Sequence, residues 1–172
     1  GVEHHRVGLV ERARGLDGVE HRVEVEECRT RRDHSQRSRA DRLLVRVAGD
    51  LEKPNGIIGT PDGKALYVAD IGAGKTYRYD SAPDGSLTGK TLVAEHGSDG
   101  MTLDSEGHLY LTGDGVLVLD REGRQVEHIP VPDERWTSNV SFGGKDRRTL
   151  FITASTGLYG VRMRVKGANT AK

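Results

Sequence analysis

From Leu43 onward, short stretches in which apolar and polar residues alternate are separated by Asp-Gly and Glu-Gly turns. Alternation of this kind, bounded by turn residues, is typical of antiparallel β-strands. No segment after Leu43 keeps the period of an amphipathic helix, which is about 3.6 residues. The pattern therefore predicts an all-β body. The expected strands lie near residues 43–48, 55–60, 65–70, 75–80, 88–94, 99–104, 108–112, 115–120, 125–129, 139–143, 149–154 and 157–165.

Three segments of this β-rich part begin alike and recur at a regular interval. They start at Asn55, Asp99 and Asn139, which are 44 and then 40 positions apart. A period of about 40–45 residues that carries about four strands is typical of a β-propeller blade. Residues 43–172 hold about three such blades, whereas a closed propeller needs about four to eight. We therefore expect an incomplete β-propeller that corresponds to the C-terminal half of a larger one.

The first 42 residues differ in composition from the rest of the chain. They contain 10 of the 19 Arg and four of the seven His, but no Lys, Ile, Met or aromatic residue. A segment with so little large apolar surface cannot offset the entropy that it loses on ordering. It is either a charged, flexible arm or a GC-rich stretch read in the wrong frame. In both cases we expect residues 1–42 to be non-homologous and unpacked, and residues 43–172 to form the blades.

The overall composition argues against several classes of protein. Lys plus Arg and Asp plus Glu both number 26, so no basic surface for nucleic acid dominates. No apolar run approaches the roughly 20 residues that span a bilayer, and the start of the chain does not resemble a signal peptide. The single cysteine, Cys28, completes no metal-binding spacing. We expect a soluble protein without a nucleic-acid, membrane or specific protein partner. Its compartment, whether cytoplasmic, periplasmic or secreted, stays open.

The first residue of each repeat carries the candidate chemistry. The first strand of a propeller blade is the innermost one, so equivalent positions on successive blades converge on the central channel. There Asn55, Asp99 and Asn139 would offer two amide oxygens and a carboxylate, which suit Ca²⁺ or another hard divalent cation. The alternative is that Asn and Asp only turn the chain into the strand. Trp136, just before the third repeat, either lines the mouth of this site or packs between blades.

The repeats resemble the regucalcin/gluconolactonase family of sugar lactone lactonases. The matching stretches are Lys53-Pro-Asn-Gly-Ile-Ile-Gly-Thr-Pro-Asp-Gly-Lys, Ser98-Asp-Gly-Met-Thr-Leu-Asp and Asn139-Val-Ser-Phe-Gly-Gly-Lys-Asp. Members of this family are calcium-dependent, six-bladed propellers that hydrolyse sugar lactones. The resemblance implies that Asn55 and Asp99 are metal ligands and that Asp99 is also the general base. Asn139 matches a family position near the channel, where it would support the ligands or face the substrate.

The chain departs from the family pattern in one respect that concerns the metal. Family members supply an early Glu and a second Asn to the same ion, from Glu-Gly-Pro and Pro-Asn-Asp stretches that do not occur here. Our main hypothesis is metal-assisted attack of water on a lactone carbonyl, with Asp99 accepting the proton of the water. The alternatives are a metal-stabilised propeller that binds or acts as a scaffold without catalysis, and an inactive truncated product.

Overall fold

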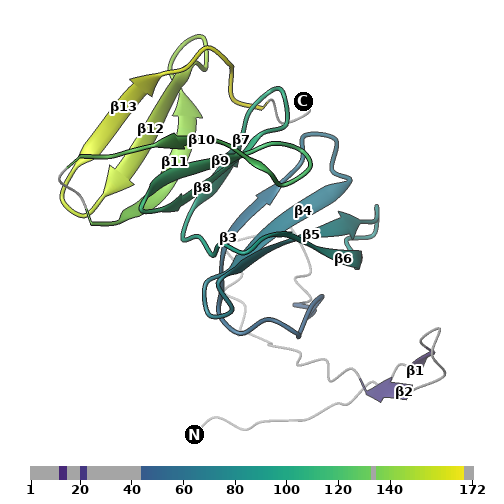
Figure 1. Ribbon diagram of the computed structural model, residues 1–172. Helices are drawn as coiled ribbons and strands as arrows, with labels where there is room; N and C mark the ends of the chain where they lie inside the picture. Colours follow the sequence, from purple (N-terminus) through teal and green to yellow (C-terminus); the bar gives the residue numbers. More distant parts are fainter. Residues whose placement is uncertain (1–11, 15–19, 23–43, 133–134, 169–172) are drawn as a thin grey trace, which may run out of the picture. The chain divides into compact units, whose positions relative to one another are not determined.

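The computed structural model describes residues 12–14, 20–22, 44–132 and 135–168 (Figure 1). All regular elements in these ranges are β-strands, which confirms the expected all-β class. Within the same ranges, no helix is long and apolar enough to cross a lipid bilayer. The chain divides into two compact units, Gly1–Val47 and Ala48–Lys172.

The first unit contains a short antiparallel pair of strands, β1 (Arg12–Arg14) and β2 (Glu20–Arg22). The alternation pattern did not predict strands in this segment. The other residues of 1–42 lie outside the described residues. The expectation that this segment is an unpacked arm therefore stays a prediction.

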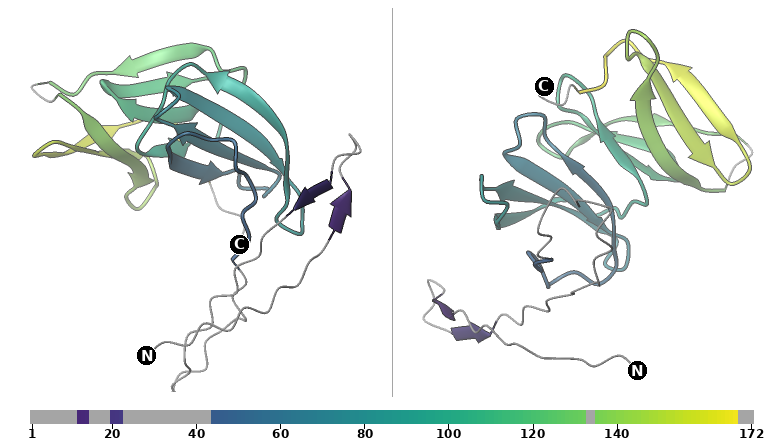
Figure 2. Two further views of the ribbon diagram at one scale, coloured as in Figure 1. Left: turned by 90° about the horizontal axis from the view of Figure 1, so that it is seen from below. Right: turned by 180° about the vertical axis from the view of Figure 1, so that it is seen from behind.

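The second unit consists of three antiparallel sheets in which consecutive strands pair in chain order (Figures 1 and 2). The first sheet contains β3 (Pro54–Gly59), β4 (Ala65–Asp70), β5 (Lys75–Ser81) and β6 (Leu87–Ala94). The second contains β7 (Met101–Leu103), β8 (Leu109–Gly113), β9 (Gly115–Leu119) and β10 (Gln125–Ile129). The third contains β11 (Thr137–Gly143), β12 (Thr149–Ala154) and β13 (Leu158–Arg162). These meanders are the three blades that the repeat predicted, and β7 contacts β3 on one side and β11 on the other.

The prediction of a strand at residues 43–48 is wrong. Residues 44–50 have no regular secondary structure, and Leu44, Val45 and Val47 are exposed. Among the described strands none pairs with this segment. A segment of alternating apolar and polar residues forms a strand only where a neighbouring strand pairs with its backbone N–H and C=O groups and its apolar side chains are buried in a core.

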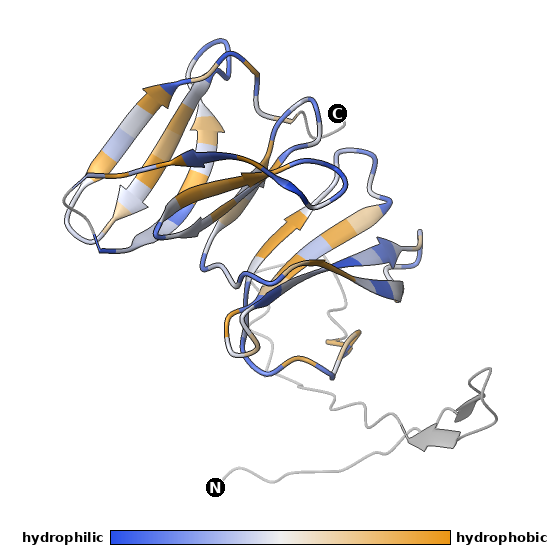
Figure 3. Cartoon of the chain, viewed as in Figure 1, coloured by the Kyte–Doolittle hydropathy of each residue, from blue (hydrophilic) through white to orange (hydrophobic). Residues whose placement is uncertain are grey.

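The hydrophobic core lies between adjacent blades. Successive side chains of a strand point to opposite faces, so β8 sends Leu109 and Leu111 into one cluster and Tyr110 into another. Tyr110 packs edge-on against Phe142 of the third blade, with ring centroids 5.3 Å apart. Figure 3, which is coloured by hydropathy, shows that β9 is hydrophobic. The outer strand beside it, β10, is mostly hydrophilic. The three inner strands of the second blade, β7, β8 and β9, are therefore buried between the neighbouring blades, whereas β10 is exposed.

Two glycines allow the inner strands of neighbouring blades to approach each other. The N–H of Gly56 donates to the carbonyl of Ser98 at 3.1 Å, and a Cβ at Gly56 would lie 3.0 Å from that oxygen. A Cβ at Gly100 would lie 2.7 Å from the Cα of Asn139, which is closer than any side chain tolerates. These glycines follow Asn55 and Asp99 directly. Each Asn-Gly or Asp-Gly pair thus combines a side chain of the candidate site with a backbone that can pass its neighbour closely.

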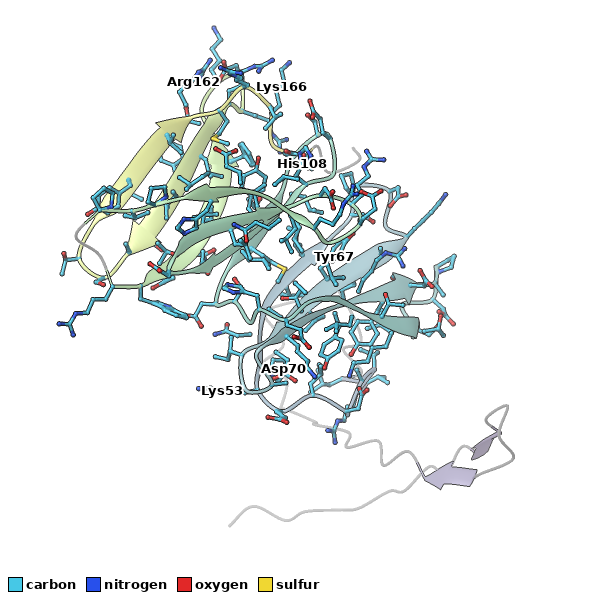
Figure 4. The ribbon with its side chains drawn as sticks, viewed as in Figure 1. Lys53, Tyr67, Asp70, His108, Arg162 and Lys166 are labelled. Atoms are coloured by element: carbon cyan, nitrogen blue, oxygen red, sulfur yellow. The ribbon has the colours of Figure 1, made fainter. Side chains whose placement is uncertain are left out.

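Asp70, the last residue of β4, fixes the segment that enters β3. Its buried carboxylate accepts the backbone N–H groups of Glu52 and Lys53, each at 2.7 Å, and that of Ala73 at 3.4 Å. Figure 4 shows Asp70 close to Lys53. Burial acts to raise the pKa of Asp70, but these donors outweigh it and hold the pKa below its usual range. Because the anchored residues come just before Asn55, Asp70 anchors the backbone that leads to that residue.

Replacing Gly100 with Ala should destabilise the second unit by about 1–3 kcal/mol, because the new methyl group overlaps the backbone of β11. The free energy of unfolding can be measured in urea by circular dichroism. Gly59→Ala in β3 is the matched control, since the nearest neighbour of a Cβ there lies at 3.9 Å. Equal stabilities of the two variants would contradict the close contact between β7 and β11.

Replacing Asp70 with Asn should lower the free energy of unfolding by about 1–3 kcal/mol at neutral pH, because an amide N–H₂ then faces backbone donors. The folded-state pKa of Asp70 is lowered, so its stabilisation is present above the unfolded pKa of about 4 and is lost as the pH falls through the folded pKa. The difference between wild type and variant should therefore shrink in acid. A difference in urea unfolding that stays constant from neutral pH to about pH 2 would argue against this role of the carboxylate.

Candidate functional site

The structure brings Asn55 and Asp99 together where two inner strands begin. Asn55 is the second residue of β3, and Asp99 lies two residues before β7. The Nδ2 of Asn55 donates to the Oδ1 of Asp99 at 2.7 Å, although the residues are 44 positions apart in the chain. Asn55 is exposed and Asp99 is half-buried. A turn residue bonds to nearby backbone, whereas this pair bonds between blades, so the convergence that the repeat predicted is present for these two residues.

Trp136 completes this cluster. Its Nε1 donates to the Oδ2 of Asp99 at 2.7 Å, so the two oxygens of one carboxylate have donors from different blades. Trp136 is 44% exposed. Of the two interpretations that the sequence left open, the structure therefore favours the one in which Trp136 lines the site. The sequence contained only its position before the third repeat as a signal for this role.

Asn139 lies against Gly100, next to the pair, but its side-chain oxygen bonds to the backbone of the following residue. It is the third residue of β11 and follows a register shift between Thr137 and Asn139. Its Oδ1 accepts the N–H of Val140 at 2.9 Å. Its Cα lies against Gly100, the residue after Asp99. The expected part of Asn139, to support the ligands or to face the substrate, stays a prediction.

Buried hydroxyl groups hold the backbone on both sides of Asp99. The hydroxyl of Ser98 donates to the carbonyl of Gly100 at 2.6 Å, and the Oγ1 of Thr112 accepts the N–H of Gly100 at 2.9 Å. The two hydroxyl oxygens are 3.1 Å apart, and both residues are completely buried. Buried polar groups that satisfy one another in this way make a segment rigid. The backbone that carries Asp99 is therefore held in place by two buried hydroxyl groups, to which no sequence motif assigned this role.

The cluster offers hard oxygen donors to a cation. Asn55 uses its Nδ2 for the contact with Asp99, which leaves its Oδ1 for another partner, and each carboxylate oxygen of Asp99 has a second lone pair. Ca²⁺ takes about six to eight oxygen ligands. In the part of the chain that the structure describes, no three or more His, Cys, Asp and Glu side chains gather as a metal site. The donor types thus fit a hard divalent cation, for which these two residues would supply part of the coordination.

A groove of about 630 Å³ lies apart from this cluster. It runs along β6, β9 and β10, and His96, Asp114 and His128 are among its lining residues. Its lining includes neither Asn55 nor Asp99. The groove is therefore separate from the candidate residues Asn55 and Asp99, which lie where the inner strands begin.

Comparisons with known sequences identify relatives of this chain. Residues 26–156 match the family described as SMP-30/Gluconolactonase/LRE-like region. The chain is 36% identical over 118 residues to a 6-deoxy-6-sulfogluconolactonase of Pseudomonas putida, which covers 63% of this chain and 40% of that protein. It is 33% identical over 126 residues to a pentonolactonase of Haloferax volcanii, which covers 68% and 43%. The matched range overlaps the end of segment 1–42, and the boundary at residue 43 stays a prediction.

Solved structures with the same fold agree with these relatives. A gluconolactonase of Xanthomonas campestris superposes with a TM-score of 0.63 and 32% identity, over 70% of this chain and 41% of that one. A calcium-binding protein, regucalcin, of Agrobacterium tumefaciens superposes with the same TM-score at 24% identity, over 73% and 50%, and this likeness concerns the fold. The chain spans about half or less of the length of these proteins. Because the family match covers about three quarters of its residues, the chain belongs to the SMP-30/gluconolactonase/LRE-like family.

Proposed function

We propose that this chain contributes part of the active site of a metal-assisted sugar lactone hydrolase. The observation that carries the proposal is the hydrogen-bonded pair of Asn55 and Asp99, which two neighbouring blades present at the same end of their inner strands. The names of the relatives support the substrate class, since they include a gluconolactonase, a sulfogluconolactonase and a pentonolactonase. The chain covers only part of each relative, so the activity of the whole protein belongs to the proposal.

The proposed reaction is the attack of water on the ring ester of the lactone. The Asp99 carboxylate accepts a proton from the water while the oxygen of the water bonds to the carbonyl carbon. The bond between that carbon and the ring oxygen then breaks, and the ring oxygen takes up a proton to give the open hydroxy acid. The half-buried position of Asp99 leaves it accessible to water, while Asn55 and Trp136 fix its orientation.

A hard divalent cation, Ca²⁺ by the family resemblance, completes the proposed site. Asn55 and Asp99 would hold it through their side-chain oxygens, together with ligands from outside this pair. When bound, the cation would polarise the lactone carbonyl. Asn139 would support the pair or contact the substrate.

Asp99→Asn keeps the size of the side chain and removes its charge and basicity. It should lower the hydrolysis of an aldonolactone by about 10²- to 10⁴-fold, the usual contribution of a positioned base. The rate can be followed by acid release with a pH indicator. Asp114→Asn is the matched control, because Asp114 is exposed and lies in the turn between β8 and β9. Near-wild-type turnover by Asp99→Asn would refute the assignment of the base.

Ca²⁺ binding, measured by calorimetry after removal of metal with a chelator, tests the ligands independently of catalysis. Asn55→Ala and Asp99→Asn should each weaken binding at least tenfold, because a side-chain oxygen ligand is lost or loses its charge. Asp114→Asn should bind like wild type. Chelation should also abolish any turnover, and CaCl₂ should restore it. Turnover absent from a chain that still binds Ca²⁺ would favour the non-catalytic binding module.

A further inference from the structure

Neither the proposed metal ion nor the proposed base, Asp99, accounts for the presence of Trp136 in the site. We infer that Trp136 is a positioning residue with two tasks. Its indole N–H orients the Asp99 carboxylate, and its exposed ring supports the C–H face of a bound sugar lactone. The second task rests on the proposed function, whereas the first rests on the hydrogen bond alone.

The orienting task follows from the partners of the carboxylate. Asn55 donates to Oδ1 and Trp136 to Oδ2 of Asp99, both at 2.7 Å. The terminal torsion of an Asp side chain is intrinsically broad, so a carboxylate with a single donor can rotate about its last bond. Donors at both oxygens prevent this rotation, and hydrogen bonds to an ionised acceptor are strong. The unused lone pairs then point in fixed directions, which a base and metal ligand requires.

The position of the indole is set by the third blade. Thr137, the next residue, is completely buried and accepts the N–H of Gly113 at 3.0 Å through its hydroxyl oxygen. The same hydroxyl donates to the carbonyl of Gly115 at 2.6 Å. The carbonyl of Trp136 accepts the N–H of Ser155 at 3.2 Å. The turn between β8 and β9 and the turn between β12 and β13 thus anchor the backbone on which the indole is carried.

The ring of Trp136 is the feature that points to a sugar. Its N–H is satisfied, yet 44% of the residue is open to solvent beside a polar cluster. Ligand sites combine apolar or aromatic surface with a few placed polar groups, and Trp provides a large rigid surface. A sugar lactone carries its hydroxyl groups around the ring edge and C–H groups on its faces. One face can therefore lie on the indole while the carbonyl reaches Asp99.

Nuclear magnetic resonance tests the orienting task directly. Trp136 is the single tryptophan of the chain, so its indole N–H gives one signal in a ¹⁵N-edited spectrum. This signal should shift when Asp99→Asn removes the charge of the acceptor. It should stay in place in Asp84→Asn, because Asp84 is exposed in the turn between β5 and β6 of the first blade. An indole signal that is identical in wild type and Asp99→Asn would overturn the orienting task, because a merely structural Trp would not sense that charge.

Two substitutions separate the ring from its N–H. Trp136→Phe keeps an aromatic face without the donor, and Trp136→Leu removes both. The probe is an aldonolactam, an unreactive analogue in which N–H replaces the ring oxygen, titrated by calorimetry in the presence of CaCl₂. Trp136→Phe should bind within about threefold of wild type, and Trp136→Leu at least tenfold more weakly. In turnover, Trp136→Phe should lower kcat with little change in KM, whereas Trp136→Leu should also raise KM.

The outcomes distinguish this inference from the proposed function. Equal lactam affinity of wild type and Trp136→Leu would overturn the task of the ring and leave the proposed hydrolase standing. Failure of the wild-type chain to bind the lactam, with or without CaCl₂, would overturn both the proposed function and the task of the ring. The response of the indole signal to Asp99→Asn would still decide the orienting task by itself.

Discussion

The close approach of the inner strands is the constraint on which the rest of the second unit depends. β7 lies between β3 and β11, and it can do so because Gly56 and Gly100 present no side chain to the neighbouring backbone. This contact brings three blades to a common end, where their side chains meet. The hydrophobic clusters between the blades hold the sheets together, but the glycines determine how near the functional groups come.

The fold was largely predictable from the sequence because its signals are local. Alternating apolar residues and Asp-Gly or Glu-Gly turns located most strands within one or two residues, and the repeat located the blades. The prediction of a strand at residues 43–48 failed because strand formation also depends on a non-local condition. A strand needs a neighbour for its backbone, and Leu44, Val45 and Val47 have no paired strand among the described residues. The alternation of apolar and polar residues indicates that a segment prefers the strand conformation, but it does not indicate whether another strand is present to pair with it.

The candidate site was predictable only for residues at equivalent positions of the repeats, because such positions lie close together in a propeller. Asn55 and Asp99 could be paired because equivalent positions of successive blades converge. The contacts of Trp136 and Asp70 could not be predicted in this way, since the other repeats carry different side chains at the corresponding positions. The hydroxyl group of Thr112 is likewise invisible in the sequence, because buried threonines look like ordinary strand residues. Contacts of this kind depend on three-dimensional proximity alone.

The donors that hold Asp99 are both electrically neutral. An amide and an indole fix the direction of the carboxylate, as Lys or Arg could, yet they add no positive charge. A Lys or Arg partner would both orient a carboxylate and compensate its charge, whereas the two donors at Asp99 only orient it. The negative charge of Asp99 consequently remains available at the mouth of the blades. It creates a local potential that attracts cations and repels anions.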